Sequence, residues 1–208
     1  MYKTTKAGFC IKKDFLSAQE LLELNGEISS CDLLGSCELG EGENGEPCKG
    51  EGLGVIFKKD KLLEVYEKLP SLKPLLDKCL KEKCNIFYFC AIKLQDQGAI
   101  APHFDDNLPK YCDEVHGSDR ELPPKPYCTS LFYANVPKEI KGGALFFPSS
   151  TLNLTPASNL FVEFGDLEHS VSPIEAPKGS FRLSMALEQY KYLSTDLELF
   201  PDVLFIKG

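Results

Sequence analysis

The stretch "NIFYFCAIKL" (residues 85–94) marks the point where the character of the chain changes. Its aromatic and β-branched residues are typical of a β-strand. Further short strand-like runs, separated by turn residues, follow at 98–104, 127–136, 142–148, 159–165, 167–174 and 179–190. Strands of this length and spacing predict a mainly β protein with a β-sandwich or jelly-roll core from about residue 85 to 190.

The segment before this stretch is predicted to be helical. Apolar residues at helix-like spacing predict helices over 14–28, 59–69 and 71–83, and Pro70 ends or kinks the second of them. Ser17 followed by Glu20 predicts a capping box at the first helix. We therefore expect a single domain in which residues 1–84 support the core at 85–190, with a C-terminal extension at 191–208.

Two stretches are predicted to be long polar loops. Residues 30–54 are rich in glycine, glutamate and cysteine, and residues 105–126 are polar and contain prolines and His116. Such loops often act as lids or binding loops, so we expect these two to determine the substrate. The glutamates of the first loop indicate either a solvated acidic surface or a surface that attracts a basic peptide or amine. His116 is expected to be a solvated loop residue or a substrate contact.

Composition narrows the possible functions. The 208 residues carry a formal net charge of −8, which weighs against a protein built to grip nucleic acid. No apolar run approaches the roughly 20 residues that span a bilayer, and no signal peptide is recognisable, so no membrane association is expected. The nine cysteines are scattered and odd in number. This pattern favours reduced thiols and predicts a cytoplasmic or nucleocytoplasmic protein.

The chain contains only three histidines, and two of them suggest a metal site. In "APHFDDN" (101–107), His103 and Asp105 stand two residues apart, so they point to the same side of an extended chain. His169, in "FGDLEHSVSPI" (164–174), is the natural third ligand from another strand. Two histidines and one carboxylate leave three coordination positions open, which suits non-heme Fe(II) that activates O2.

Arg182, which follows His169 in the sequence, could bind a co-substrate of the metal site. A 2-oxo acid chelates iron through its keto and carboxylate oxygens, and its far carboxylate then needs a partner. Arg182 can supply a planar two-point contact, and Ser184, two residues further along the same strand, can donate another hydrogen bond.

These motifs together resemble the 2-oxoglutarate- and Fe(II)-dependent oxygenases, and most closely their prolyl 4-hydroxylase branch. The similarity is carried by "HFD", "TSLFYAN", "GGALFFP", "FVEFGDLEHSVSP" and "FRLS", which fall within residues 85–190. The resemblance implies a double-stranded β-helix of the cupin-like type. It also implies that His103, Asp105 and His169 bind Fe(II) and that Arg182 holds the distal carboxylate of 2-oxoglutarate.

The same resemblance implies the reaction and further contacts. Tyr133 in "YAN", and Thr129 four residues before it, are expected to contact the co-substrate together with Ser184. The reaction implied is hydroxylation of a C–H bond by O2, coupled to decarboxylation of 2-oxoglutarate to succinate, with ascorbate as a possible stimulant. The substrate implied is a prolyl residue in a protein or peptide, or a free amino acid or small metabolite. The oligomeric state stays open.

Some positions depart from the family pattern. Where family members often carry a tyrosine before the H-x-D motif, this chain has Lys93 and Leu94, and Lys93 could reach the co-substrate carboxylate. The sequence "QGAIAPHFDD" also resembles AlkB-type demethylases, but Glu188 stands where their second arginine is expected. A nucleic-acid or protein demethylase and a cupin-like metal-binding protein without turnover therefore remain as alternatives.

Overall fold

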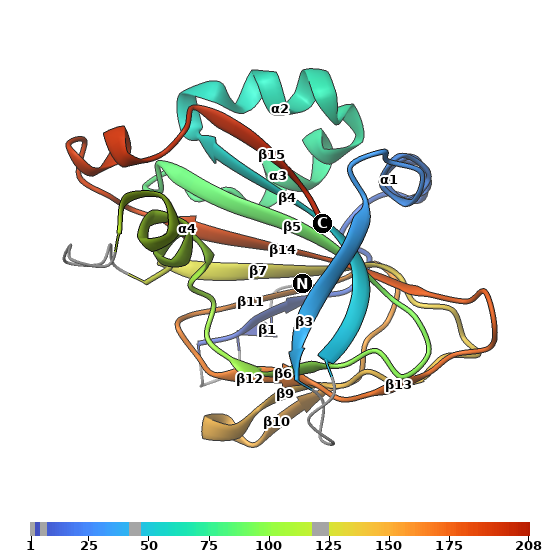
Figure 1. Ribbon diagram of the computed structural model, residues 1–208. Coiled ribbons are helices and arrows are strands. Elements are labelled where there is room, and N and C mark those ends of the chain that lie inside the picture. Colours follow the sequence, from blue (N-terminus) through green and yellow to red (C-terminus); the bar gives the residue numbers. More distant parts are fainter. Residues whose placement is uncertain (1–2, 5–7, 42–46, 118–124) are drawn as a thin grey trace.

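A large antiparallel sheet forms the centre of the computed structural model, which describes residues 3–4, 8–41, 47–117 and 125–208 (Figure 1). A four-stranded sheet lies below it in the view of Figure 1, and a two-stranded ribbon lies beside that sheet. The large sheet has the order β1 (Lys3–Thr4), β2 (Cys10–Lys12), β11 (Leu160–Phe164), β7 (Cys128–Asn135), β14 (Arg182–Tyr190), β5 (Ile86–Leu94), β4 (Pro47–Lys58) and β15 (Val203–Lys207), and β3 (Gly35–Glu41) also pairs with β4.

The smaller sheet forms the second layer of the fold. Its order is β10 (Leu152–Leu154), β9 (Leu145–Phe147), β12 (His169–Val171) and β6 (Ile100–His103), and the ribbon pairs β13 (Ile174–Glu175) with β8 (Lys141–Gly142). All these pairings are antiparallel. Two facing antiparallel sheets of this kind confirm the predicted jelly-roll core.

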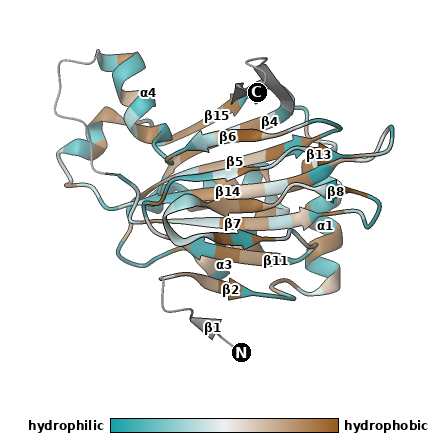
Figure 2. Cartoon of the chain, turned by 90° about the horizontal axis from the view of Figure 1, so that it is seen from below, coloured by the Kyte–Doolittle hydropathy of each residue, from teal (hydrophilic) through white to brown (hydrophobic). Residues whose placement is uncertain are grey.

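The central strands of the large sheet have two chemically different faces, because side chains alternate along a strand. On one face, Phe87 and Phe89 of β5 join a buried core that includes Met185 of β14. On the other face, residues of the opposite parity line a cavity between the two sheets. Figure 2 shows the apolar character of these central strands and the mixed polarity of the surrounding helices.

Three helices cover the first face: α1 (Ala18–Ser29), α2 (Leu62–Lys68) and α3 (Lys73–Cys79). All three were predicted, and the capping box between Ser17 and Glu20 is present at α1. The single-turn 3-10 helices are η1 (Lys59–Lys61), η2 (Pro70–Leu72), η3 (Pro148–Ser150) and η4 (Asp196–Leu199). Pro70 begins η2, so it ends the second helix as predicted.

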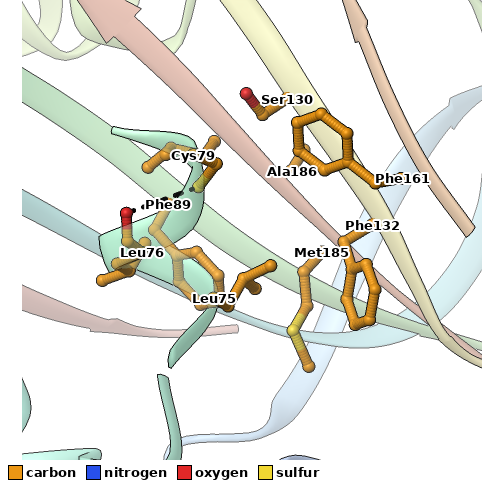
Figure 3. A pocket seen from close by; sticks show the side chains of 10 residues that line it. Leu75, Leu76, Cys79, Phe89, Ser130, Phe132, Phe161, Met185 and Ala186 are labelled. Carbon is orange, nitrogen blue, oxygen red and sulfur yellow. Dashed lines mark hydrogen bonds between the residues drawn. The ribbon is translucent and has the colours of Figure 1, made fainter. Parts of the chain in front are cut away.

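The contact between α3 and the sheet is tightly packed (Figure 3). Leu75, Leu76 and Cys79 of α3 face Phe89 and Met185, and the gap between them measures only about 10 Å³. A gap of this size is no larger than one water molecule, so the helix adds a well-filled layer to the core.

The prediction of a loop over residues 30–54 is wrong, because β3 and β4 form a hairpin there. Gly52 and Gly54, which resembled loop residues, lie inside β4. A Cβ atom at Gly52 would lie 2.9 Å from Sγ of Cys37, and one at Gly54 would lie 3.1 Å from the hydroxyl of Tyr88. These glycines therefore leave room for neighbouring side chains rather than breaking the strand.

The prediction of a loop over residues 105–126 is wrong for its first half, which forms helix α4 (Asn107–His116). Pro109 lies in the first turn, where a missing amide hydrogen costs little. The backbone N–H of Asn107 donates to Glu188 of β14 at 3.1 Å, so a side chain distant in sequence satisfies one of the unpaired donors at the start of the helix. The second half of the predicted loop lies largely outside the described residues.

The segments at the two ends of the chain add strands to the large sheet. β4 belongs to residues 1–84, β15 belongs to residues 191–208, and the two pair with each other over 53–57 and 203–207. Among the described helices, none combines the length and apolar character needed to cross a bilayer.

We expect Leu76→Ala to destabilise the protein by about 2–5 kcal/mol, because Leu76 is fully buried between α3 and the sheet. Urea unfolding followed by circular dichroism measures this loss. Leu63→Ala on α2 is the matched control, since Leu63 is 72% exposed and its loss should change stability by less than about 0.5 kcal/mol. Equal effects of the two substitutions would contradict the assignment of α3 to the core.

Candidate metal centre and its cavity

Strand register brings the two predicted histidine ligands together. His169 of β12 is paired directly with His103 of β6, so their rings lie side by side with centroids 4.3 Å apart. Asp105 follows two residues after β6 ends at His103, and its carboxylate turns back toward both rings. The ligating atoms of these three residues all lie within 4.8 Å of one another.

The donor atoms of this cluster fit a metal ion. Nδ1 of His103 is bonded to the carbonyl oxygen of Ala101 at 2.8 Å, and Nδ1 of His169 to that of Leu167 at 3.0 Å. Each Nε2 is thereby directed toward Asp105 Oδ1, 3.8 Å away in both cases, which is too long for a hydrogen bond. Two imidazole nitrogens and a carboxylate oxygen that face one point without bonding each other are the ligand set expected around a divalent cation.

The surroundings of His169 favour the neutral imidazole that a metal requires. The ring lies edge-on to Phe164, with centroids 4.9 Å apart, and the residue is only 7% exposed. Burial lowers the pKa of His169 below its usual value, against an opposing contribution from Asp105. Burial therefore favours the neutral ring, in which the proton on Nδ1 donates to the carbonyl oxygen of Leu167 and the Nε2 lone pair is available for a metal.

Thr129 lies beside the cluster, in contact with a predicted ligand. Its hydroxyl donates to Oδ2 of Asp105 at 2.6 Å, and both residues are buried. The prediction placed Thr129 against the co-substrate, whereas this contact orients the Asp105 carboxylate so that Oδ1 faces the histidines. Such a hydroxyl does not contact the metal itself but holds the carboxylate in the orientation that metal binding requires.

Arg182 is a buried cation at the other end of the same cavity. It is 1% exposed, its Nη1 donates to the carbonyl oxygen of Gly143 at 2.8 Å, and its Nε has no partner. Burial lowers its pKa, and in the described chain no acidic side chain pairs with it. A buried guanidinium without a carboxylate partner is costly, so this position suits the binding of an anion.

Tyr133 faces the same space from β7. Its ring centroid lies 5.5 Å from Cζ of Arg182, and its buried hydroxyl has no hydrogen-bond partner. Burial raises the pKa of Tyr133 to about 12, so the hydroxyl keeps its proton and can donate it. Gly143 has φ +68°, and a Cβ atom there would lie 2.8 Å from Nη1 of Arg182, so glycine is needed at this position both for the backbone conformation and for the space of the guanidinium.

One cavity of about 510 Å³ joins the metal cluster to Arg182. Ser184 and Tyr133, which the sequence predicts to be co-substrate contacts, both line it. Both segments that were predicted to determine the substrate also reach it, through Cys37 and Leu39 of β3 and through Asn107 and Lys110 of α4.

Other predicted candidates lie elsewhere. Lys93 points to the opposite face of β5, where its Nζ lies 2.8 Å from Glu51, so it cannot reach the co-substrate site. Glu51 is the one glutamate of the 30–54 segment whose side-chain contacts are described, and this contact with Lys93 neutralises its charge. His116 is exposed at the end of α4, and its Nε2 contacts the carbonyl oxygen of Leu199 at 2.8 Å.

Glu188 is a buried residue of the site whose role sequence reasoning missed. Its carboxyl group is bonded to both nitrogens of Asn107 and to the hydroxyl of Tyr190. Burial and the nearby Asp105 carboxylate raise the pKa of Glu188 to about 8. It connects β14 to the start of α4, which begins two residues after Asp105. The alternation of the sequence placed Glu188 on the same face as Arg182, but its partners could not be read from the sequence.

The fold and the centre together define a double-stranded β-helix with a cluster of two histidines and one carboxylate. The comparisons with solved structures agree with this class. A 2OG-Fe(II) oxygenase family oxidoreductase from Burkholderia pseudomallei has a TM-score of 0.58 at 11% identity, over 89% of this chain and 86% of that one. A prolyl-4-hydroxylase from Pseudomonas putida has a TM-score of 0.56 at 17% identity, over 90% and 95%.

A third similar structure contains a bound peptide. It is a prolyl hydroxylase from Trichoplax adhaerens in complex with a fragment of the oxygen degradation domain of hypoxia inducible factor, with a TM-score of 0.52 at 14% identity over 89% of this chain and 84% of that one. No family model and no curated protein matches the sequence. The chain therefore has the fold of the 2OG-Fe(II) oxygenases and prolyl hydroxylases, as the sequence resemblance predicted.

We expect Thr129→Val to weaken Fe(II) binding about tenfold, because Oδ2 of Asp105 loses the hydroxyl that holds it. Anaerobic equilibrium titration with Fe(II) measures the change, and Thr129→Ser should restore most of the affinity. If the substitution instead weakened 2-oxoglutarate binding and left the Fe(II) affinity intact, Thr129 would be a co-substrate contact as the sequence first suggested.

Proposed function

We propose that this protein is an Fe(II)- and 2-oxoglutarate-dependent dioxygenase that hydroxylates a C–H bond. The observation that carries the proposal is the buried, unpaired Arg182 in the same cavity as the cluster of His103, Asp105 and His169. A site that only bound a metal ion would give no reason to bury an arginine nearby. A cation and a metal site that share one cavity suit a ligand with a chelating group at one end and a carboxylate at the other.

His103, Asp105 and His169 would hold the iron through two neutral imidazoles and one carboxylate. Bound Fe(II) with 2-oxoglutarate would supply the oxidative chemistry, in which O2 converts the keto acid to succinate and CO2 and hydroxylates the substrate. The protein supports this by keeping both imidazoles fixed through their Nδ1 atoms and by orienting Asp105 through Thr129. Ascorbate is expected to stimulate turnover.

Arg182 would bind the distal carboxylate of 2-oxoglutarate. Its Nε and the hydroxyl of Tyr133 are two buried donors without a hydrogen-bond partner in the described chain, and a charge-assisted hydrogen bond to a carboxylate would be strong there. Ser184 lies two residues further along β14 on the same face and lines the cavity, so its hydroxyl can add a third contact. These donors would fix the co-substrate and exclude water from its far end.

The substrate is proposed to be a protein or peptide residue, such as a prolyl residue, or a small metabolite. The peptide in the Trichoplax structure and the similarity to prolyl hydroxylases support the first possibility. The cavity argues against a nucleic-acid demethylase, because Lys110, the one lysine that lines it in the described chain, is paired with Asp106 at 2.7 Å. The unpaired donors at Arg182 and Tyr133 argue against a cupin-like protein that only stores metal.

The test is an anaerobic titration of the purified protein with Fe(II) and 2-oxoglutarate. We expect the visible iron-to-keto-acid charge-transfer band, because the cavity provides both the metal site and the carboxylate partner. Arg182→Ala should raise the 2-oxoglutarate concentration for half-saturation by more than about tenfold, since a charged hydrogen-bond partner is lost. His103→Ala should abolish the band.

Lys93→Ala serves as the matched control, because Lys93 is a basic residue at the same level of the sheet that faces away from the cavity. Its titration curve should be that of the wild type. If iron binds but no band develops, the proposal gives way to a metal-binding protein that does not use a keto acid.

A further inference from the structure

Asp105, the carboxylate of the candidate metal centre, lies on a segment without regular secondary structure. Residues 104–106 connect β6 to α4 and form neither helix nor strand. We call them the ligand segment. The two histidines of the centre, by contrast, lie on strands that are paired with each other. The position of Asp105 therefore depends on the contacts that hold the ligand segment and the start of α4 in place.

The start of α4 is held by a residue from another part of the chain. Asp106 is the N-cap of α4, but its side chain makes no capping hydrogen bond, and the first turn contains no acidic residue. The first N–H groups of a helix need acceptors from outside the helix. Glu188 is such an acceptor, because it accepts from the backbone N–H of Asn107 at 3.1 Å and also from the side-chain amide of Asn107. Strand β14 therefore fixes the residue that directly follows the ligand segment.

Glu188 and Thr129 act on this part of the chain from neighbouring positions. Thr129 of β7 is paired directly with Glu188 of β14, so the two side chains lie side by side on one face of the sheet. Thr129 donates to Oδ2 of Asp105 at 2.6 Å, and Glu188 accepts from Asn107, two residues further along the chain. One pair of strands thus holds the carboxylate of Asp105 and the backbone just beyond it.

The burial of Glu188 is costly for the core. The residue is 1% exposed, and the Asp105 carboxylate lies close enough to help raise the pKa of its carboxyl group. Among the described residues no lysine or arginine forms an ion pair with it, and its hydrogen bonds come from Asn107 and Tyr190. A buried carboxyl group near a second carboxylate is tolerated only when it is bonded. Its contact with Asn107 is therefore the contribution that this position makes to the site.

We propose that Glu188 is a positioning residue of the metal centre. By holding Asn107 it fixes the end of the ligand segment, so that Asp105 keeps Oδ1 directed at the two histidines. Glu188 acts through Asn107 and is not itself a ligand of the metal. This inference rests on the proposed function, because it concerns the carboxylate that would bind the iron.

This role predicts that metal binding and co-substrate binding respond differently to the loss of Glu188. Arg182 and Ser184, which are assigned to 2-oxoglutarate, belong to β14 itself, and Arg182 is also bonded to the carbonyl oxygen of Gly143. Neither depends on the ligand segment for its position. The Fe(II) affinity should therefore fall while the 2-oxoglutarate site is retained. A general loss of folded structure would not separate the two.

The main test is Glu188→Gln, which keeps the size of the side chain and removes its charge. Anaerobic titration with Fe(II) should show binding about 3- to 10-fold weaker than in the wild type. At saturating Fe(II), the 2-oxoglutarate concentration that half-saturates the charge-transfer band should change by less than about twofold. In metal-free protein, hydrogen exchange over residues 104–107 should become faster, because the N–H of Asn107 loses a charged acceptor.

Gln189→Met is the matched control. Gln189 is the next residue of β14 and is fully buried, but it faces α3, where it is bonded to the carbonyl oxygen of Cys79 and the N–H of Lys81. Its replacement should lower the stability to urea while the Fe(II) affinity and the exchange over residues 104–107 stay as in the wild type. The visible spectrum of Co(II) bound in place of Fe(II) should change in Glu188→Gln and not in this control.

Asn107→Ala is a second variant, which decides the question if Glu188→Gln does not fold. Asn107 is partly exposed, and the substitution removes only its side-chain contact with Glu188, so we expect Fe(II) binding about 2- to 5-fold weaker. Unchanged Fe(II) affinity in both variants, or an equal loss in Gln189→Met, would overturn the proposal. So would weaker 2-oxoglutarate binding with the Fe(II) affinity intact, which would make Glu188 a co-substrate contact.

The failure of the proposed function gives a different result. A wild type that binds Fe(II) but develops no charge-transfer band with 2-oxoglutarate would overturn the dioxygenase. The Fe(II) affinities of the variants would then still decide whether Glu188 positions Asp105.

Discussion

The alternation of side chains along β14 is the constraint on which the rest of the structure depends. Leu183, Met185 and Leu187 pack against the helices, whereas Arg182 and Ser184 face the cavity. Because the side-chain period of a strand is two residues, a shift of one position would bury the apolar set in the cavity and press a guanidinium into the core. Strand β5 pairs with β14 over its whole length, and β7 pairs with it from Leu183 to Gln189, with a register shift between Leu183 and Ser184. The stability of the core and the chemistry of the cavity are therefore set by the same pairing.

The register of the smaller sheet positions the two histidines of the candidate metal centre. The direct pairing of His169 with His103 places two imidazoles next to each other, and neither needs a long or flexible side chain to reach the common point. Backbone carbonyls two residues upstream fix both rings, and Thr129 of the large sheet fixes Asp105. The ligand set is thus held by rigid strands from both sheets, which is the arrangement that gives a metal site a defined geometry.

The two elements that frame the cavity are anchored to the large sheet. Helix α4 begins at Asn107, where Glu188 of β14 accepts from its backbone and side chain. The β3–β4 hairpin brings Cys37 and Leu39 over the cavity while β4 itself is paired with β5. Strand β14 therefore carries Arg182 at one end and, near the other, Glu188, which anchors the helix beside the candidate metal centre. One strand can therefore set the position of Arg182 in the cavity relative to that of Asp105 in the candidate metal centre.

The sequence by itself determined the jelly-roll core, the N-terminal helices and the grouping of His103, Asp105 and His169 with Arg182. These follow from local periodicity and from a set of rare residue types whose order along the chain is informative. Only the tertiary structure decided that the glycine-rich segment is a hairpin, that α4 is a helix, that Thr129 contacts Asp105 and that Lys93 faces away from the cavity. The physical reason is that each of these depends on a partner distant in sequence. The sequence does not show that a neighbouring side chain fills the space beside a glycine, or that the N–H at a helix start donates to a glutamate side chain 81 residues away.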